Sequence, residues 1–145
     1  MKKAFVIGDP IHHSLSPALH GFWLSKYDID GSYEAINVPE RYLAKTVRKL
    51  ADDGYVGGNV TIPHKEKLLM MADEIDDIAK KVGAVNTIKF NNGKIIGSNT
   101  DVYGFIENLK AANVDLSIHK NALILGAGGA ARAIIAGLQA EGVQE

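Results

Sequence analysis

The sequence predicts an α/β fold in which a mostly parallel sheet is flanked by helices. Three observations support this fold class. Short apolar runs alternate with helical patterns along the chain, polar clusters follow several of these runs, and a glycine-rich turn joins the last run to a helix. Strands that alternate with helices form βαβ units, and the strands of such units lie parallel.

The first elements follow from apolar runs and helix-start signals. Ala4 to Gly8 is apolar throughout and predicts a buried strand. Ser16 is expected to be the N-cap of the next helix, with Pro17 at its first position. The elements expected after it are a strand at 33–38, a helix at 39–53 ended by Gly54, and a strand at 58–62.

The second half begins with two predicted helices, at 65–72 and 73–82. The runs 85–90 and 94–97 flank Asn91-Asn92-Gly93, a turn typical of a hairpin. The remaining elements expected are a helix at 101–112 capped by Thr100 or Asp101, a polar linker at 113–119, and a strand at 122–125 that leads into the glycine-rich turn.

Composition narrows the function classes. The chain has 145 residues, 16 Lys and Arg against 17 Asp and Glu, and a formal net charge of -1, so it lacks the basic excess typical of nucleic-acid or anionic-membrane binders. It has no cysteine, which excludes disulfides and thiolate nucleophiles. The apolar run before Asp9 is too short for a secretory signal, and Arg132 interrupts the apolar stretch 122–138, so neither predicts a membrane segment. We expect a cytoplasmic protein that acts on a small molecule.

The polar clusters are expected to form one ligand site. Ser14 to Ser16, Asn59 to Lys65 and Asn99 to Asp101 each lie where a predicted strand has just ended. In open α/β sheets, ligands bind beyond the carboxyl ends of the strands.

The glycine-rich turn matches the dinucleotide-binding fingerprint that opens a Rossmann-type domain. It follows a predicted strand and begins a helix, the context in which glycines let the backbone approach a pyrophosphate. The residues expected to bind the cofactor are Gly126, Ala127, Gly128, Gly129 and Ala130. Small residues at such a turn can also serve packing alone. The residue that separates NAD from NADP lies about 20 positions further on, past Glu145.

Five segments, in order and spacing, resemble shikimate dehydrogenases. They are SLSP at 14–17 with His20, GNVTIPHK at 58–65, GAVNT at 83–87, NTD at 99–101 with Gly104, and the glycine-rich turn. The resemblance implies two α/β domains with the substrate between them. It also implies NADP-dependent, reversible reduction of 3-dehydroshikimate to shikimate, in the pathway to aromatic amino acids.

The resemblance assigns catalytic roles to two residues. Lys65 matches the family's catalytic lysine and Asp101 its carboxylate partner. Carbonyl reduction requires a proton for the oxygen, and a positioned ammonium can supply it. The structural alternatives are a solvated lysine in a first helical turn and a helix-capping aspartate.

The resemblance also assigns binding roles. Ser14 and Ser16 match the serines that bind the substrate carboxylate; their alternatives are a turn serine and an N-cap. Asn59, Thr61 and Asn86 match contacts to the substrate hydroxyls, with hydrogen bonding at turns and strand ends as the alternative. Asp77 matches an acidic position near the cofactor, or else is a solvated helix residue.

These matches divide the chain into a substrate-binding and catalytic domain at 1–112 and a linker with the truncated start of an NADP-binding domain at 113–145. Further cofactor strands and C-terminal helices of the family are not in the sequence, so we expect the chain alone to be inactive. A single βα unit cannot form its own core. The residues from about Asn121 should therefore dock on the first domain, join a second chain (a homodimer is one option) or fray.

Two other functions remain as alternatives. One is a quinate/shikimate dehydrogenase of relaxed specificity, against which Ser16 counts because such relatives often have Thr there. The other is a non-catalytic binder of shikimate-like acids, which would not need both Lys65 and Asp101. NAD is not excluded as the cofactor. We expect no metal, since no histidines have metal-binding spacing; they are His12, His13, His20, His64 and His119.

Overall fold

A computed structural model describes residues 1–118 and 120–144. The strands are β1 (Lys2–Gly8), β2 (Gly31–Asn37), β3 (Tyr55–Val60), β4 (Glu74–Ile75), β5 (Thr87–Asn91) and β6 (Lys94–Ser98). The helices are α1 (Ser16–Lys26), the 3-10 turn η1 (Glu40–Tyr42), α2 (Leu43–Asp52), α3 (Lys65–Met71), α4 (Asp77–Val82), α5 (Asp101–Ala111) and α6 (Gly129–Ala140). His119 and Glu145 lie outside the described residues.

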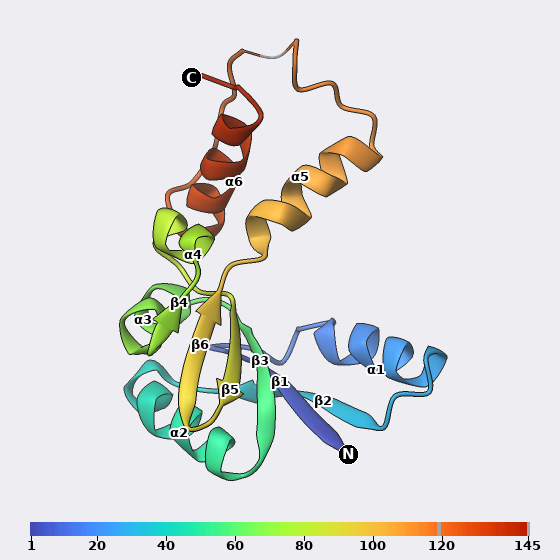
Figure 1. The fold of residues 1–145 in the computed structure, drawn as a ribbon, viewed down its shortest axis with the longest axis vertical. Coiled ribbons are helices and arrows are strands. Elements are labelled where there is room, and N and C mark those ends of the chain that lie inside the picture. The colour runs from blue at the N-terminus through green and yellow to red at the C-terminus, as the bar shows by residue number, and fades with distance from the viewer. Residues whose placement is uncertain (119, 145) are drawn as a thin grey trace.

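Within the described residues, the strands form one six-stranded sheet in the order β2-β1-β3-β5-β6-β4 (Figure 1). β1 pairs in parallel with both β2 and β3, and β4 pairs in parallel with β6. β5 pairs antiparallel with β3 and with β6, so it alone among the described strands runs the opposite way. The prediction of an α/β fold with a mostly parallel sheet is confirmed.

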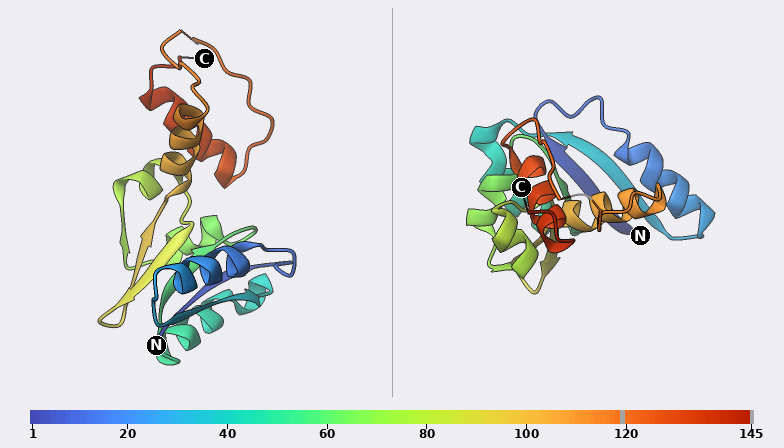
Figure 2. Two further views of the ribbon diagram at one scale, coloured as in Figure 1. Left: turned by 90° about the vertical axis from the view of Figure 1, so that its right-hand side faces the viewer. Right: turned by 90° about the horizontal axis from the view of Figure 1, so that it is seen from above.

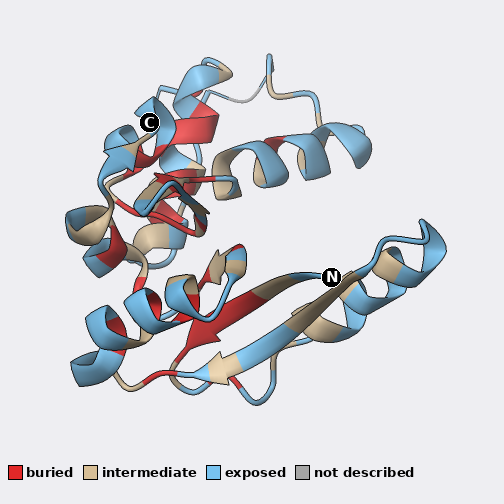
Figure 3. Ribbon diagram, turned by 60° about the horizontal axis from the view of Figure 1, so that its bottom comes forward, coloured by how far each residue is buried: buried red, intermediate tan, exposed pale blue. Residues whose placement is uncertain are grey.

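One face of the sheet forms the main core. Phe5, Ile7, Val60 and Ile88 point to this face and are almost fully buried. They pack against the apolar side of α2, where Val47 is fully buried. Figure 3 shows this buried region as red segments in the central strands. The central strands are thus packed against α2 through this buried face.

The opposite face carries polar side chains and lies beside α1. Tyr33 and Asn59 share this face, because Tyr33 pairs with Ala4 of β1, and Asn59 pairs with Val6 two residues further along. None of the residues of α1, all of which are described, is buried. The predicted Ser16 N-cap is wrong: Ser16 is already helical, Leu15 takes the cap position, and no described side chain caps the helix.

The predicted helix at 73–82 is also wrong in its first half. Glu74–Ile75 forms β4, and Asp73 is hydrogen-bonded to the Ile95 backbone in both directions, through its N–H at 2.9 Å and its carboxylate at 2.8 Å. Pairing with the exposed edge of β6 outweighs helix propensity here. α4 starts only at Asp77, after Asp76 accepts a capping hydrogen bond from the Ala79 N–H at 2.6 Å.

The hairpin prediction is confirmed. β5 and β6 are joined at Asn92 and Gly93, whose φ angles are 50° and 78°. Positive φ at both central residues is what a type I′ hairpin turn requires.

α5 rises from the end of β6, and α6 lies beside it (Figures 1 and 2). Ala133 and Ala136 of α6 pack against Val82 and Ala84, and Gly137 faces Ile106 of α5 so closely that an added Cβ would lie 3.0 Å from the Ile106 Cγ1. Three outcomes were predicted for the residues after Asn121: docking on the first part of the chain, joining a second chain, or fraying. α6 docks on the first part of the chain.

The predicted strand at Ala122–Leu125 is wrong. These residues have no regular secondary structure, and Leu123 and Leu125 are 89% and 90% exposed. A strand forms only when a neighbouring strand supplies its hydrogen-bond partners, and no described strand lies beside this segment. Of the expected Rossmann-type βα unit, only the turn and helix are formed. Among the described helices, none is long and apolar enough to cross a membrane.

Candidate active site

Lys65 is the first residue of α3, and the residue before it fixes where that helix begins. The His64 side chain is fully buried, and its Nε2 donates to the Val38 carbonyl at 2.7 Å. The backbone N–H of His64 donates to the Thr61 carbonyl at 2.9 Å, which closes the turn before the helix. These bonds tie the turn to the end of β2 and hold the start of α3 in place.

Lys65 and Asp101 form an ion pair. The Lys65 Nζ lies 2.5 Å from the Asp101 Oδ2, and the two side chains are 17% and 30% exposed. Asp101 begins α5, where its N–H donates to the Asn99 side chain at 2.9 Å. The buried Asn99 also donates to the Ala84 carbonyl at 2.9 Å, so it ties the start of α5 to the loop after α4. The carboxylate therefore stands on an anchored helix end.

Asn86 orients the second oxygen of that carboxylate. Its Nδ2 donates to the Asp101 Oδ1 at 2.7 Å and to the Thr100 Oγ1 at 2.9 Å, and its Oδ1 accepts from the Thr100 N–H at 3.0 Å. Asn86 is 7% exposed. Both of its amide protons are engaged within the protein, so its geometry supports a role in holding Asp101.

Asn59 extends the network across the polar face of the sheet. Its Nδ2 donates to the Thr87 Oγ1 at 3.1 Å, and the Thr87 hydroxyl donates to the Asn86 Oδ1 at 2.9 Å. On its other side, the Asn59 Oδ1 accepts from the Tyr33 hydroxyl at 2.6 Å. The predicted residues Asn59, Asn86, Asp101 and Lys65 thus belong to one hydrogen-bonded network.

A cavity of about 560 Å³ separates the turn before α3 from the glycine-rich turn. Thr61 and Lys65 line one side, and Gly126, Gly128 and Gly129 line the other. A Cβ at Gly129 would lie 3.7 Å from the Lys65 Cδ, so the two segments are in near contact. The predicted catalytic residue and the predicted nucleotide turn therefore face the same space.

The glycine-rich turn fits a pyrophosphate group. Gly126 has a φ of 125°, which favours glycine, and nothing described lies within 4 Å of a Cβ built at Gly126 or Gly128. Gly128 is the N-cap of the twelve-residue α6, and no described side chain caps the helix. The first N–H groups of α6 are thus left for an anion.

Ser14, Ser16 and Asp77 have no described hydrogen bond or ion pair with the Lys65–Asp101 pair. The Ser14 Oγ accepts from the Ser16 N–H at 3.3 Å, a local turn, and no described hydrogen bond joins either serine to Lys65 or Asp101. The Asp77 side chain is 98% exposed and pairs with Lys80 at 3.3 Å, so among the described contacts it has only this local partner. The functional roles of these residues remain predictions.

Sequence reasoning missed several members of the network, namely Tyr33, Thr87 and the anchoring roles of His64 and Asn99. Tyr33 lies in β2, outside every recognised motif, where a single tyrosine gives only a weak signal. Thr87, His64 and Asn99 lie inside the recognised motifs, and a polar residue buried or half-buried within a motif is the signal that could have found them.

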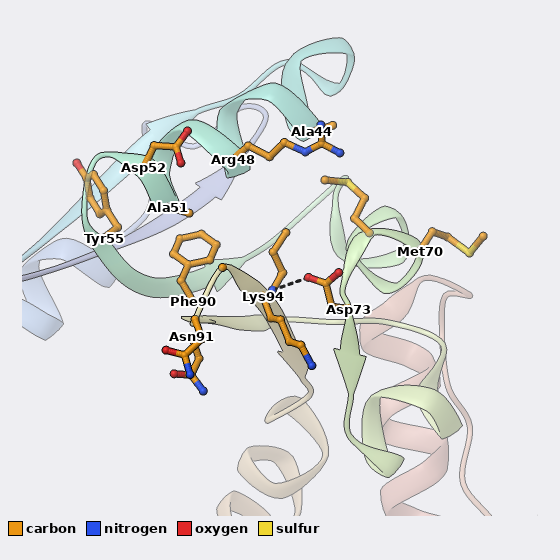
Figure 4. Close-up of a pocket in the computed structure, with 14 residues that line it drawn as sticks. Ala44, Arg48, Ala51, Asp52, Tyr55, Met70, Asp73, Phe90, Asn91 and Lys94 are labelled. Carbon is orange, nitrogen blue, oxygen red and sulfur yellow. Dashed lines mark hydrogen bonds between the residues drawn. The ribbon is translucent and has the colours of Figure 1, made fainter.

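A larger cavity, of about 840 Å³, lies away from these residues (Figure 4). Arg48 and Asp52 of α2 border it on one side, and Asp73 and Lys94 border it on another. Charges of both signs surround it without converging on a shared point, and Lys94 is engaged by Glu74 at 2.7 Å. We therefore place the candidate site at Lys65 and not at this larger cavity.

Comparison with known families decides the membership of the chain. Residues 6–88 match the family described as shikimate dehydrogenase substrate binding domain. The chain belongs to this family. One curated relative, the NADP-dependent shikimate dehydrogenase of Brucella abortus, is 49% identical over 142 residues, which cover 98% of this chain and 49% of the relative. The chain thus spans about half the length of the curated relatives it matches.

Solved shikimate dehydrogenases share the fold. The enzyme of Thermus thermophilus, solved in complex with NADP(H) and shikimate, is 40% identical with a TM-score of 0.92 and covers 99% of this chain, which covers 54% of it. The enzyme of Listeria monocytogenes, solved with shikimate and NAD, is 36% identical with a TM-score of 0.89, over 99% of this chain and 49% of that one.

Proposed function

We propose that this chain is the substrate-binding and catalytic part of a shikimate dehydrogenase, which reduces 3-dehydroshikimate reversibly to shikimate with NADP. The observation that carries the proposal is the Lys65–Asp101 pair, which stands beside the cavity that Lys65 shares with the glycine-rich turn. The proposal assigns residues 1–112 to the substrate domain and residues 113–145 to the linker and the start of the NADP-binding domain.

Lys65 acts as the proton donor in this proposal. As the carbonyl carbon gains a hydride, its oxygen gains negative charge and takes a proton from the Lys65 ammonium. Asp101 holds the ammonium in one position through the 2.5 Å contact, and Asn86 holds Asp101. In the reverse direction, a neutral Lys65 accepts the hydroxyl proton of shikimate.

The polar residues around the pair bind the rest of the substrate. Ser14 and Ser16 donate to the carboxylate, while Asn59 and Thr61 contact the ring hydroxyls. Hydroxyl and amide groups suit a polyol because they both donate and accept hydrogen bonds. In the present arrangement Asn86 would bind a substrate hydroxyl only by giving up one of its contacts to Thr100 or Asp101.

The glycine-rich turn would hold the pyrophosphate of the cofactor. The residues proposed are Gly126, Ala127, Gly128, Gly129 and Ala130, with Asp77 as an acidic neighbour. When bound, NADP supplies the hydride for the carbonyl carbon. The names of the curated relatives support NADP, while the Listeria monocytogenes complex keeps NAD as an alternative. We also propose that the protein is located in the cytoplasm and forms a homodimer.

Calorimetric titration of the chain with shikimate, with quinate as the comparison, tests the substrate assignment. Circular dichroism first establishes that the sample is folded. We expect binding of shikimate in preference to quinate. Equal binding would favour the relaxed quinate/shikimate enzyme. If neither this chain nor a form extended to the length of its relatives bound either acid, the proposal would be overturned.

Turnover separates an enzyme from a non-catalytic binder. The extended form should oxidise shikimate with NADP, and the Lys65→Ala variant should not. Shikimate binding without turnover in the extended wild type would favour a sensor.

A further inference from the structure

Tyr33 is tied to the candidate site, although no motif includes it. Its hydroxyl donates to the Asn59 Oδ1 at 2.6 Å from β2, across the intervening strand β1. Its ring stacks on His20 of α1, with ring centroids 3.9 Å apart and planes inclined by 5°. The phenol is thus fixed both by its ring and by its hydroxyl.

The direction of each hydrogen bond in the network follows from one backbone donor. The Thr100 N–H can only donate, so it fixes the acceptor end of the Asn86 amide. The Thr87 hydroxyl donates its proton to the same Asn86 Oδ1, at 2.9 Å. Its oxygen must therefore act as the acceptor in the hydrogen bond with its other neighbour. That group is the Asn59 Nδ2, at 3.1 Å. The Asn59 oxygen consequently faces Tyr33.

Little hydrogen-bonding capacity remains on Asn59. Its Nδ2 donates to the Thr87 Oγ1 and, at 3.5 Å, to the Asn86 carbonyl, which uses both amide protons. Its Oδ1 has two lone pairs, of which the Tyr33 hydroxyl takes one. A ligand at Asn59 can therefore use only one acceptor position.

We propose that Tyr33 is a positioning residue of the substrate site: it fixes the Asn59 amide so that its free lone pair receives a proton from a substrate hydroxyl. This inference rests on the proposed function. Thr87 holds the nitrogen end of the amide and Tyr33 the oxygen end, so the loss of either contact leaves the amide plane free to turn.

Tyr33→Phe tests the inference because it removes the hydroxyl and keeps the ring that stacks on His20. Tyr55→Phe is a matched control: the Tyr55 hydroxyl is also hydrogen-bonded, to Glu34, but its partner lies outside this network. Wild type and both variants, each as the whole 145-residue chain, are titrated with shikimate by calorimetry. The side-chain amide signals of Asn59 are recorded by ¹⁵N NMR in the free proteins.

Tyr33→Phe should weaken shikimate binding by about 3- to 10-fold, the usual effect of losing one hydrogen bond, and should shift the Asn59 amide signals. Tyr55→Phe should change neither. In an extended form that turns over, Tyr33→Phe should raise KM with little change in kcat, because the contact is the same in the ground and transition states.

The outcomes separate the inference from the proposed function. Unshifted Asn59 amide signals in Tyr33→Phe would overturn the inference whatever the ligand does. Equal shikimate affinity of the wild type and Tyr33→Phe would overturn it while leaving the proposed function intact. If the wild type is folded but binds no shikimate, both as the 145-residue chain and as the extended form, the inference and the proposed function would both be overturned.

Discussion

The Lys65 ammonium donates to the Asp101 carboxylate at 2.5 Å, although 36 positions separate the two residues in the chain. Each is the first residue of its helix, α3 or α5. Helix starts are well defined in space when buried side chains anchor them, as His64 and Asn99 do here. The fold therefore brings the short Asp101 side chain and the longer Lys65 side chain together.

Replacing Lys65 should abolish most turnover. In a form extended to the length of the relatives, Lys65→Ala should lower kcat by about 100- to 10,000-fold, the usual contribution of a positioned acid or base. Lys67→Ala is the control, since Lys67 lies on the same helix and pairs with the exposed Glu40. Turnover is followed by NADPH absorbance. Undiminished kcat in Lys65→Ala would contradict the proposed role.

Removing Asn86 should destabilise the protein. Asn86→Ala leaves the Asp101 Oδ1 and the Thr100 N–H without the Asn86 amide as their partner, at a cost of about 1–3 kcal/mol. Asn108→Ala, an exposed position on α5, should cost much less. Urea unfolding followed by circular dichroism measures both. If Asn86→Ala lowered the free energy of unfolding no more than Asn108→Ala does, the network would add little to stability.

His20 should make the protein less stable in acid. Burial under neighbouring side chains lowers the pKa of His20 below its ordinary value of 6.5. The unfolded chain then binds a proton on His20 more readily than the folded chain does. The contribution of His20 is present above about pH 6.5 and is lost as the pH falls through the lower folded value.

NMR titration of the His20 ring measures this pKa directly. Tyr33→Ala removes the ring stacked on His20 and should bring the pKa back toward 6.5. A wild-type pKa at or above 6.5 would contradict the prediction.

The docking of α6 should fail when its buried face is charged. Ala133 is 1% exposed, so Ala133→Glu would bury a carboxylate between α6 and the loop after α4. Hydrogen exchange should then show loss of amide protection along α6. Ala140→Glu, at an exposed position of the same helix, is the control and should keep the protection. Protected α6 amides in Ala133→Glu would mean that α6 is held by other contacts.

Two glycines should respond in opposite directions to alanine. Nothing described lies within 4 Å of a Cβ at Gly21, in the middle of α1, so Gly21→Ala should stabilise the protein by about 0.5–1 kcal/mol. A Cβ at Gly58 would overlap the Phe5 carbonyl and ring, so Gly58→Ala should destabilise it by about 1–3 kcal/mol. Thermal unfolding measures both changes. The same sign for the two variants would contradict the packing described.

Local sequence patterns predicted the elements that depend on their own residues. The apolar run at Ala4 to Gly8 became β1, and Asn92-Gly93 became the hairpin turn, because backbone preference and burial act within a few positions there. The predicted strand at Ala122 to Leu125 failed because a strand also depends on a neighbour. Glu74–Ile75 was missed for the converse reason, since β6 offers an edge that local propensity does not reveal.

The candidate site, like the fold, was predicted only in part from the sequence. The resemblance placed Lys65, Asp101, Asn59 and Asn86 in one site, and they lie in one network. Tyr33 could not be found in this way, because its contact depends on the order of the strands in the sheet. Only that order brings a side chain of β2 across β1 to β3.

Asp101 stands at the first residue of α5, where Asn99 fastens the helix to the loop after α4. An eleven-residue helix is about 16 Å long. Over that length α5 lies beside α6, and α6 also packs against Val82 and Ala84. The loop after α4 thus supports both helices, and the charge pair of Lys65 and Asp101 lies at their shared base.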